Sequence, residues 1–187
     1  MAIRWPPFCG ACSPLLEPVA PALQPPAASA AVALYAGPLA DAIRRFKYAG
    51  RTDLAPALAA LLVECAPLYG GAVDAVLPVP LHPSRLRQRG FNPAALLSRP
   101  LARALGARLL LSSVRRVRPT PAQAGLPRSQ RKDNVRGAFE IAGPLGDRIL
   151  VVDDVRTTGA TLAELALTLR EGGVREVSTL ALARAPG

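Results

Sequence analysis

The pattern of apolar and polar positions predicts strands that alternate with helices along most of this chain. Continuous apolar runs of strand length are separated by segments with apolar residues three and four positions apart. The predicted strands are 31–37, 73–80, 107–114, 137–142, 148–154 and 176–183, and the predicted helices are 38–48, 53–65, 92–106 and 161–173. This order predicts an α/β fold with a mainly parallel, twisted sheet and helices on both of its faces.

Polar residues and glycine mark several helix ends. Asp53 and Asn92 are expected to cap the helices that they begin, because a side-chain oxygen there can accept a bond from a free backbone N–H group. Gly106 is expected to end the second of these helices.

The first 30 residues differ from the rest in composition. Seven prolines lie between residues 6 and 26, which is typical of low-complexity segments. We therefore expect 1–30 to be poorly ordered and dispensable for folding, and 31–187 to form the folded domain. No apolar run reaches the ~20 residues of a membrane span, and no continuous apolar centre of a secretion signal is present. These features predict a cytoplasmic protein without membrane insertion.

The formal net charge is +10, and nearly all of the cations are arginine. One interpretation is a GC-rich genome that encodes arginine in place of lysine. The other is an anionic partner, which could be a phosphorylated metabolite, a nucleic acid or a membrane surface. Arginines cluster between Arg85 and Arg136, outside the most apolar segments.

The cysteines predict half of a metal site. Cys9 and Cys12 form a CxxC pair, but structural zinc needs four ligands, and neither a second pair nor a histidine other than His82 is present. Zn²⁺ is therefore not expected. Cys65 lies in an apolar helical pattern and is interpreted as a small buried hydrophobe.

The segment Ile149–Leu165, ILVVDDVRTTGATLAEL, carries the strongest chemical signal. Asp153 and Asp154 follow a buried strand, and ligands bind at the carboxyl ends of strands in open α/β sheets. The turn Thr157–Thr161 leads into a helix, so free N–H groups, hydroxyls and an unobstructed Gly159 form a cup for a phosphate. Two carboxylates would repel that phosphate but suit sugar hydroxyls, with or without Mg²⁺.

The segment therefore predicts a site for a ribose 5-phosphate. The alternative is a capped helix beside two solvated acids, which leaves both acids at the end of a buried strand unexplained. Neither the P-loop pattern nor the dinucleotide-binding glycine pattern occurs.

ILVVDDVRTTGAT resembles the signature of type I phosphoribosyltransferases, which bind 5-phosphoribosyl-1-pyrophosphate (PRPP). Three further segments, YAGPLADAIRRFKYAGRTDLA, LPVPLHPSRLRQRGFN and RPTPAQAGLPRSQRKDNVRGAF, resemble in this order the ComF family of competence-associated proteins. The likeness covers residues 32–184. It implies a type I phosphoribosyltransferase-like fold, with 31–70 as a helical hood and 71–187 as the core.

The resemblance also implies roles for individual residues. Asp153 and Asp154 correspond to the acids that hold the ribose hydroxyls, and Mg²⁺ would be held mostly by oxygens of the ligand. Residues 115–136 correspond to a mobile loop that covers the site, and Cys9 and Cys12 to a remnant of a zinc ribbon that has two CxxC pairs in the family. The implied 5-phosphate loop consists of Thr157, Thr158, Gly159, Ala160 and Thr161, and the implied pyrophosphate loop includes Pro80, Leu81 and His82.

The residues themselves add candidates. Arg85 and Arg89, four positions apart, are expected on one helix face toward a pyrophosphate, whereas Arg87 is expected to point elsewhere. Lys47 is interpreted as a solvated lysine on a helix. The residues of the mobile segment that could reach a bound ligand on closure are Arg118, Gln123, Arg131 and Asn134.

Two functions follow from this reading. The first is Mg²⁺-dependent phosphoribosyl transfer from PRPP with release of pyrophosphate to an acceptor that the sequence does not identify. The second is a non-catalytic protein that senses PRPP or handles single-stranded DNA with the competence machinery during DNA uptake. Single-strand binding usually pairs cations with aromatic platforms, and only Phe91 and Phe139 lie near the basic region.

Overall fold

The computed structural model describes residues 8–9, 11–19, 29–69, 73–119 and 135–186. Within these ranges the main sheet has five strands, all parallel, in the order β1-β7-β6-β2-β3. The strands are β1 (Ser29–Leu34), β2 (Ala75–Pro78), β3 (Arg108–Leu109), β6 (Arg148–Arg156) and β7 (Glu176–Arg184). The parallel α/β architecture predicted from the sequence is confirmed.

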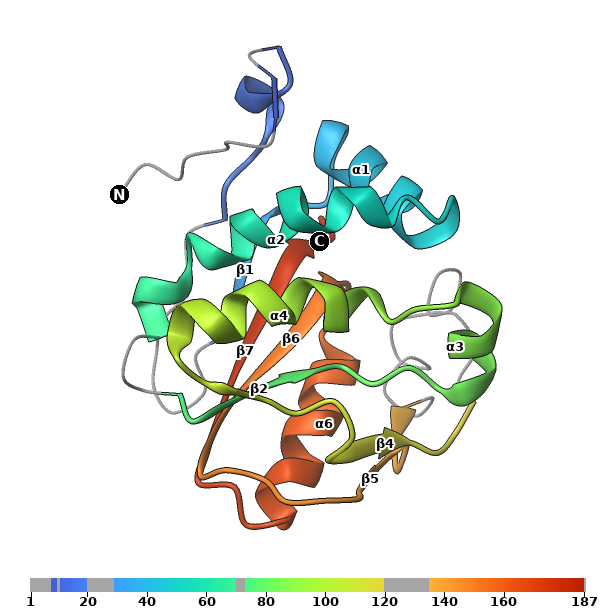
Figure 1. The fold of residues 1–187 in the computed structure, drawn as a ribbon, viewed down its shortest axis with the longest axis vertical. Coiled ribbons are helices and arrows are strands. Elements are labelled where there is room, and N and C mark those ends of the chain that lie inside the picture. Colours follow the sequence, from blue (N-terminus) through green and yellow to red (C-terminus); the bar gives the residue numbers. More distant parts are fainter. Residues whose placement is uncertain (1–7, 10, 20–28, 70–72, 120–134, 187) are drawn as a thin grey trace.

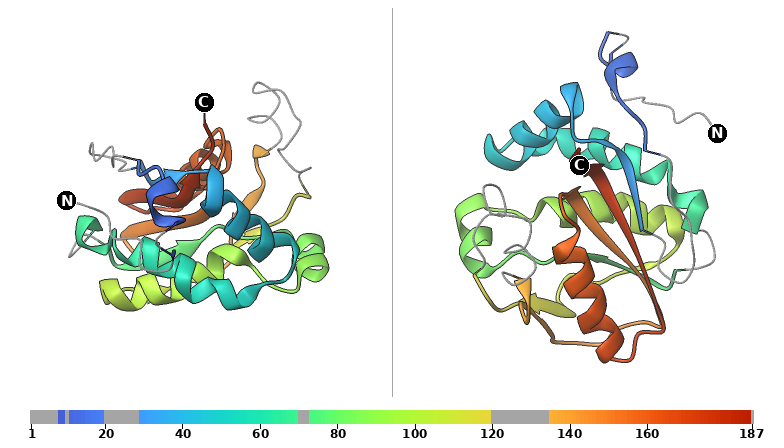
Figure 2. Two further views of the ribbon diagram at one scale, coloured as in Figure 1. Left: turned by 90° about the horizontal axis from the view of Figure 1, so that it is seen from above. Right: turned by 180° about the vertical axis from the view of Figure 1, so that it is seen from behind.

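Helices cover both faces of this sheet (Figures 1 and 2). The elements are α1 (Gly37–Tyr48), α2 (Ala55–Val63), α3 (Pro83–Arg89), α4 (Pro93–Leu105) and α6 (Ala160–Glu171), with 3₁₀ turns at Ser13–Leu15, Thr52–Leu54 and Ala66–Tyr69. Helices α2 and α4 pack together on one face, and α6 packs on the other. No helix in the described ranges has the length and apolar character needed to cross a membrane.

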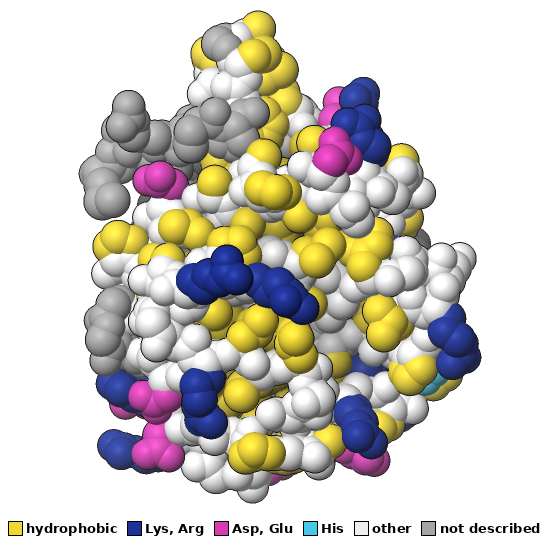
Figure 3. Space-filling view, in the orientation of Figure 1, with side chains coloured by type: hydrophobic (Ala, Val, Ile, Leu, Met, Phe, Trp, Pro, Cys, Tyr) yellow, Lys and Arg dark blue, Asp and Glu magenta, His cyan; other side chains and the backbone are white. Residues whose placement is uncertain are grey.

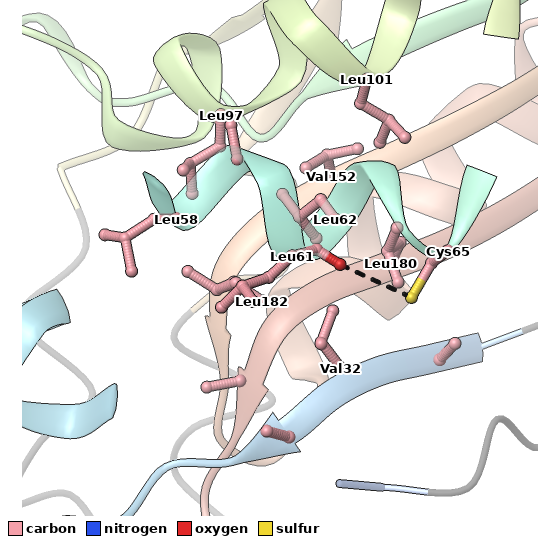
Figure 4. Close-up of a cluster of buried hydrophobic side chains, with 14 of the residues drawn as sticks. Val32, Leu58, Leu61, Leu62, Cys65, Leu97, Leu101, Val152, Leu180 and Leu182 are labelled. Atoms are coloured by element: carbon pink, nitrogen blue, oxygen red, sulfur yellow. Dashed lines mark hydrogen bonds between the residues drawn. The ribbon is translucent and has the colours of Figure 1, made fainter. Parts of the chain in front are cut away.

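Strand β6 shows why four aliphatic residues occur in a row. Leu150 and Val152 belong to the core under α2 and α4, whereas Ile149 and Val151 belong to the core under α6. Successive side chains of a strand point to opposite faces, so a strand covered on both sides needs apolar residues throughout. Figure 4 shows Val152 in the first core, among leucines of α2, α4 and β7.

The predicted strand 107–114 is wrong as a single element. Its first part, β3, joins the main sheet, and the chain then bends so that β4 (Val114–Arg116) pairs antiparallel with β5 (Phe139–Ile141) in a separate two-stranded sheet. The apolar run 107–114 does not reveal that the chain leaves one sheet for another, because both sheets bury apolar residues. The pairing also corrects the start of the predicted mobile segment, since residues 115 and 116 belong to β4.

Two of the three predicted helix ends are confirmed. Asn92 Oδ1 accepts from the backbone N of Ala94 at 3.0 Å, and α4 ends at Gly106 with φ +63°. The predicted cap Asp53 is wrong: its carboxylate pairs with Arg51 at 2.7 Å within a 3₁₀ turn, and α2 begins only at Ala55, without a side-chain cap. An oppositely charged neighbour competes for the carboxylate that would otherwise cap the helix.

Residues 16–19 pack along β1, which differs from the expectation that 1–30 lies apart from the domain. Leu16 is buried in the core under α2 and α4, and the backbone N of Leu34 donates to Glu17 O at 2.8 Å. Val19 N donates to Val32 O at 3.0 Å, and β1 itself starts at Ser29. An edge strand such as β1 has unpaired backbone groups, and residues 17–19 bond to them. The proline-rich composition of 1–30 gave no sign of this pairing.

Basic side chains also lie away from the predicted cluster. Helix α4 exposes Arg99 and Arg103, one turn apart, and two basic side chains lie side by side in the middle of the face seen in Figure 3, where α4 runs. The high net charge is therefore spread over the surface, and charge alone does not locate a partner.

Candidate functional site

A cavity of about 340 Å³ lies at the carboxyl ends of the parallel strands, with Lys47 and Tyr48 of α1 in its wall. Strands β6 and β7 and the segment after β2 reach this edge, where ligands bind in open α/β sheets. The wall combines acids, bases and hydroxyls. The polar residues that line it include Tyr35, Lys47, Tyr48, Arg85, Arg89, Asn92, Arg116, Asp153, Asp154, Thr157 and Thr161.

The two acids differ in their surroundings. Asp154 continues the strand face of Leu150 and Val152 and is 7% exposed, and Lys47 Nζ of α1 donates to its Oδ1 at 2.9 Å. The expectation that Lys47 is solvated is therefore wrong. Burial by itself would lower the pKa of Lys47, but the charges of Asp154 and then Asp153 outweigh it and raise that pKa.

Asp153 lies on the other face of β6 and is not ion-paired with Lys47. Its Oδ1 accepts from the backbone N of Asp154 at 2.8 Å. Burial, followed by the charge of Asp154, raises the pKa of Asp153 to about 7, against the opposing effect of Lys47. Near neutral pH this carboxyl exists in both protonation states, so it can accept hydrogen bonds from sugar hydroxyls or donate one.

The predicted phosphate turn leads into α6 as expected and separates two cavities. Thr157 and Thr161 line the cavity of the acids, whereas Thr158 and Gly159 line a neighbouring one that Thr157 also reaches. Gly159 stands immediately before α6 with φ +79°, a conformation that favours glycine. Ala160 is buried as the first residue of α6.

Helix α3 turns one basic face toward the cavity. Arg85 and Arg89 line the cavity and are partly buried, whereas Arg87 is exposed and outside it, as predicted from their spacing. The guanidinium of Arg89 lies 5.2 Å from the ring centre of Tyr48 in α1.

The predicted pyrophosphate loop is only partly at this cavity. Leu81 lines it, but Pro80 and His82 line a different cavity, on the side of β4. His82 Nδ1 accepts from the backbone N of Ser84 at 3.3 Å and so begins α3. The only imidazole of the sequence thus has a local structural role in this conformation.

Arg116 is a site residue that sequence reasoning missed. It is 8% exposed, lies in the cavity wall, and its guanidinium carbon is 5.5 Å from the ring centre of Phe139. Burial, and next the charge of Arg85, lowers the pKa of Arg116, while Asp153 opposes this. The only sequence signal was its position two residues beyond the predicted strand 107–114, where the sequence was interpreted as the start of a loop.

Of the four candidate residues in the predicted mobile segment, only Arg118 lies within the described residues. The side chain of Arg118 donates to the backbone O of Arg136, so the two described ends of the segment are joined. The predictions for Gln123, Arg131 and Asn134 lie outside the described residues.

Among the described residues, no group of three or more His, Cys, Asp or Glu could hold a metal ion. Asp153 and Asp154 still fit Mg²⁺, because this ion is commonly bound by one or two carboxylates together with phosphate oxygens of a substrate. Cys9 and Cys12 lie in one turn, in which Cys12 N donates to Cys9 O at 3.0 Å. Hydrogen bonds from Cys12 lower the pKa of the Cys9 thiol.

Cys65 is buried, as predicted, and its thiol donates to Leu61 O at 3.9 Å (Figure 4). It lies in the core under α2 and α4, away from the site.

Several curated proteins with names that refer to competence or DNA utilization are similar to this chain. Competence protein F of Haemophilus influenzae is 37% identical over 166 residues, which cover 81% of this chain and 70% of that protein. DNA utilization protein YhgH of Escherichia coli K12 is 37% identical over 159 residues, with coverage of 82% and 70%. Competence protein ComFC of Streptococcus pneumoniae is 30% identical over 155 residues, with coverage of 82% and 67%. No protein-family model matches the chain.

Proposed function

Because this chain belongs to the ComF/YhgH family of competence and DNA utilization proteins, we propose that its cavity binds PRPP with Mg²⁺ and transfers the phosphoribosyl group with release of pyrophosphate. One observation carries the proposal. The acids at the end of β6, the turn before α6 and the basic face of α3 line the same cavity. Its volume of about 340 Å³ is in the usual range for small-ligand sites.

Each part of the cavity suits one part of PRPP. Asp153 and Asp154 would hold the ribose hydroxyls. The turn before α6 would hold the 5-phosphate through the hydroxyls of Thr157 and Thr161 and the backbone N–H groups of the α6 N-terminus. Arg85 and Arg89 would hold the pyrophosphate, since a guanidinium matches phosphate oxygens with paired hydrogen bonds.

The proposed chemistry depends on stabilising the charge of departing pyrophosphate. Bound Mg²⁺ would supply Lewis-acid stabilisation of those oxygens. Arg85 and Arg89 would contribute from α3, and Arg116 from the buried wall, where a fixed charge is more effective than in water.

Calorimetric titration with PRPP and Mg²⁺ tests the binding proposal. The variant Asp153→Asn/Asp154→Asn should lose detectable binding while it retains its circular dichroism spectrum, because a neutral amide no longer attracts the metal and has one acceptor oxygen in place of two. Asp41→Asn/Asp53→Asn is the matched control, since both acids are exposed and lie outside this cavity. The two double variants remove the same charge. Equal affinity of the two double variants for PRPP would refute the ribose assignment.

A non-catalytic role in PRPP sensing or in DNA handling with the competence machinery is the second candidate. The names of the relatives, Competence protein F and DNA utilization protein YhgH, favour it. Release of pyrophosphate from PRPP, followed with a panel of nucleobases and amines, separates the two candidates. PRPP binding without release with any acceptor would favour sensing.

A further inference from the structure

A second cavity, of about 570 Å³, lies on the opposite side of the turn before α6. It runs beside α6, the strand β7 and the beginning of β1, and only Thr157 and Ala185 also line the cavity of the acids. Three arginines line this second cavity, and none of its lining residues is acidic: Arg156, Arg170 and Arg184. We call it the arginine groove.

The positive charges of the groove are not neutralised by carboxylates. Arg156 and Arg184 are neighbours in the register of β6 and β7, and Arg156 donates to the neutral hydroxyl of Ser29. Burial, and next the charge of Arg184, lowers the pKa of Arg156. In the described part of the chain, ion pairs engage other arginines, such as Arg51 and Arg148, but none of these three.

The groove is too long for a single phosphate group. Its lining reaches from Gly159, before the first turn of α6, to Arg170 in the last turn, a helix rise of about 16 Å. Apolar residues lie between, among them Leu162, Ala166 and Val177. Cations and hydroxyls with an apolar floor suit a ligand in which phosphate groups alternate with less polar parts.

We propose that the arginine groove is a second anion-binding site that takes the phosphate groups of an extended ligand. Arginine donates paired hydrogen bonds to phosphate, and the hydroxyls of Ser29 and Thr158 line the same groove as further donors. The phosphate groups belong either to a nucleic-acid strand or to a small phosphorylated metabolite. The groove shares Thr157 and Ala185 with the proposed PRPP cavity. Arg170 and Arg184 line the groove alone, so variants at these two arginines test it without altering that cavity.

Binding of a fluorescent single-stranded oligothymidylate to the full chain tests the site, with inorganic phosphate as the small-molecule probe. In Arg170→Ser/Arg184→Ser we expect about tenfold weaker binding, because both arginines are exposed and each exposed charge pair contributes modestly. For the oligonucleotide, the slope of log affinity against log salt should fall in magnitude by about 1.4, the share of two phosphate contacts on a single strand.

Arg87→Ser/Arg103→Ser is the control, since both arginines are exposed and lie outside both cavities. The two double variants remove the same charge. Weaker binding of the oligonucleotide alone assigns the groove to a nucleic-acid strand, and weaker binding of inorganic phosphate as well assigns it to phosphate groups in general. Equal behaviour of the two double variants with both probes overturns the proposal. Arg170→Glu provides a second variant at an exposed helix position, and its binding should be weaker still.

Discussion

Asp153 and Asp154 show how two identical neighbouring residues acquire different chemistry. They point to opposite faces of β6, so that Asp154 meets Lys47 at 2.9 Å, whereas Asp153 has no ion pair of its own among the described residues. Burial and the adjacent charge raise the pKa of Asp153 to about 7. Asp153 is consequently the group whose charge changes near neutral pH.

This difference predicts a pH-dependent effect of Asp153→Asn on stability. The folded state binds the Asp153 proton more tightly than the unfolded state does, so the free energy of unfolding falls as the pH rises from about 4 to about 7. An asparagine removes this dependence. Above pH 8 the variant should be more stable than the wild type by on the order of 4 kcal/mol, and the difference should vanish near pH 4.

Urea denaturation at pH 4, 6 and 8 provides the measurement. A stability difference that stays constant over this range would show that Asp153 titrates normally in the fold.

Helix α1 connects the separate parts of the site through three consecutive residues. Phe46 contacts the ring of Phe91 at a centroid distance of 5.4 Å, and Tyr48 lies under Arg89 of α3. Between them, Lys47 pairs with Asp154 of β6. The helix therefore positions the acid pair relative to the basic face of α3, although it contributes no backbone hydrogen bond to the sheet.

Loss of Lys47 should destabilise the fold, because it removes the ion pair between α1 and β6. Lys47→Met leaves Asp154 buried without its cation, and breaking a buried ion pair in this way costs about 3 kcal/mol of unfolding free energy. Arg44→Met is a control on the same helix, because its pair with Asp41 is exposed and screened by solvent, so its loss should change the stability little. Urea denaturation compares the two, and similar losses of stability would show that the Lys47–Asp154 pair is solvated in solution.

At the scale of the molecule, one core joins the N-terminal segment to the domain. Leu16 lies in the same core as residues of β1, α2 and α4, and residues 17–19 bond to the edge of β1. The proline-rich beginning of the chain thus packs beside the carboxyl end of β1. This is the end of the strand at which Tyr35 lines the cavity.

A chain that starts at residue 20 should be less stable than the full chain. It loses the burial of Leu16, which contributes about 2 kcal/mol, and two backbone bonds to β1. A chain that starts at Phe8 serves as the control and should keep both. The measurement is the free energy of unfolding in urea, and equal values for the two truncated chains would show that the contacts of residues 16–19 do not stabilise the fold.

The sequence by itself determined the order of strands and helices, the position of the acids at the end of β6, the turn before α6 and the shared face of Arg85 and Arg89. All of these are local. Apolar periodicity, helix capping and a contiguous motif act within a few neighbouring residues, where the printed sequence contains the whole pattern.

Only the tertiary structure decided which residues meet across long separations. Lys47 and Asp154 are 107 positions apart, and Arg116 enters the cavity wall because β4 leaves the main sheet to pair with β5. The packing of residues 16–19 on β1 and the arginine groove likewise depend on strand order. Such contacts follow from the path of the chain through the sheet, which no local pattern of side chains specifies.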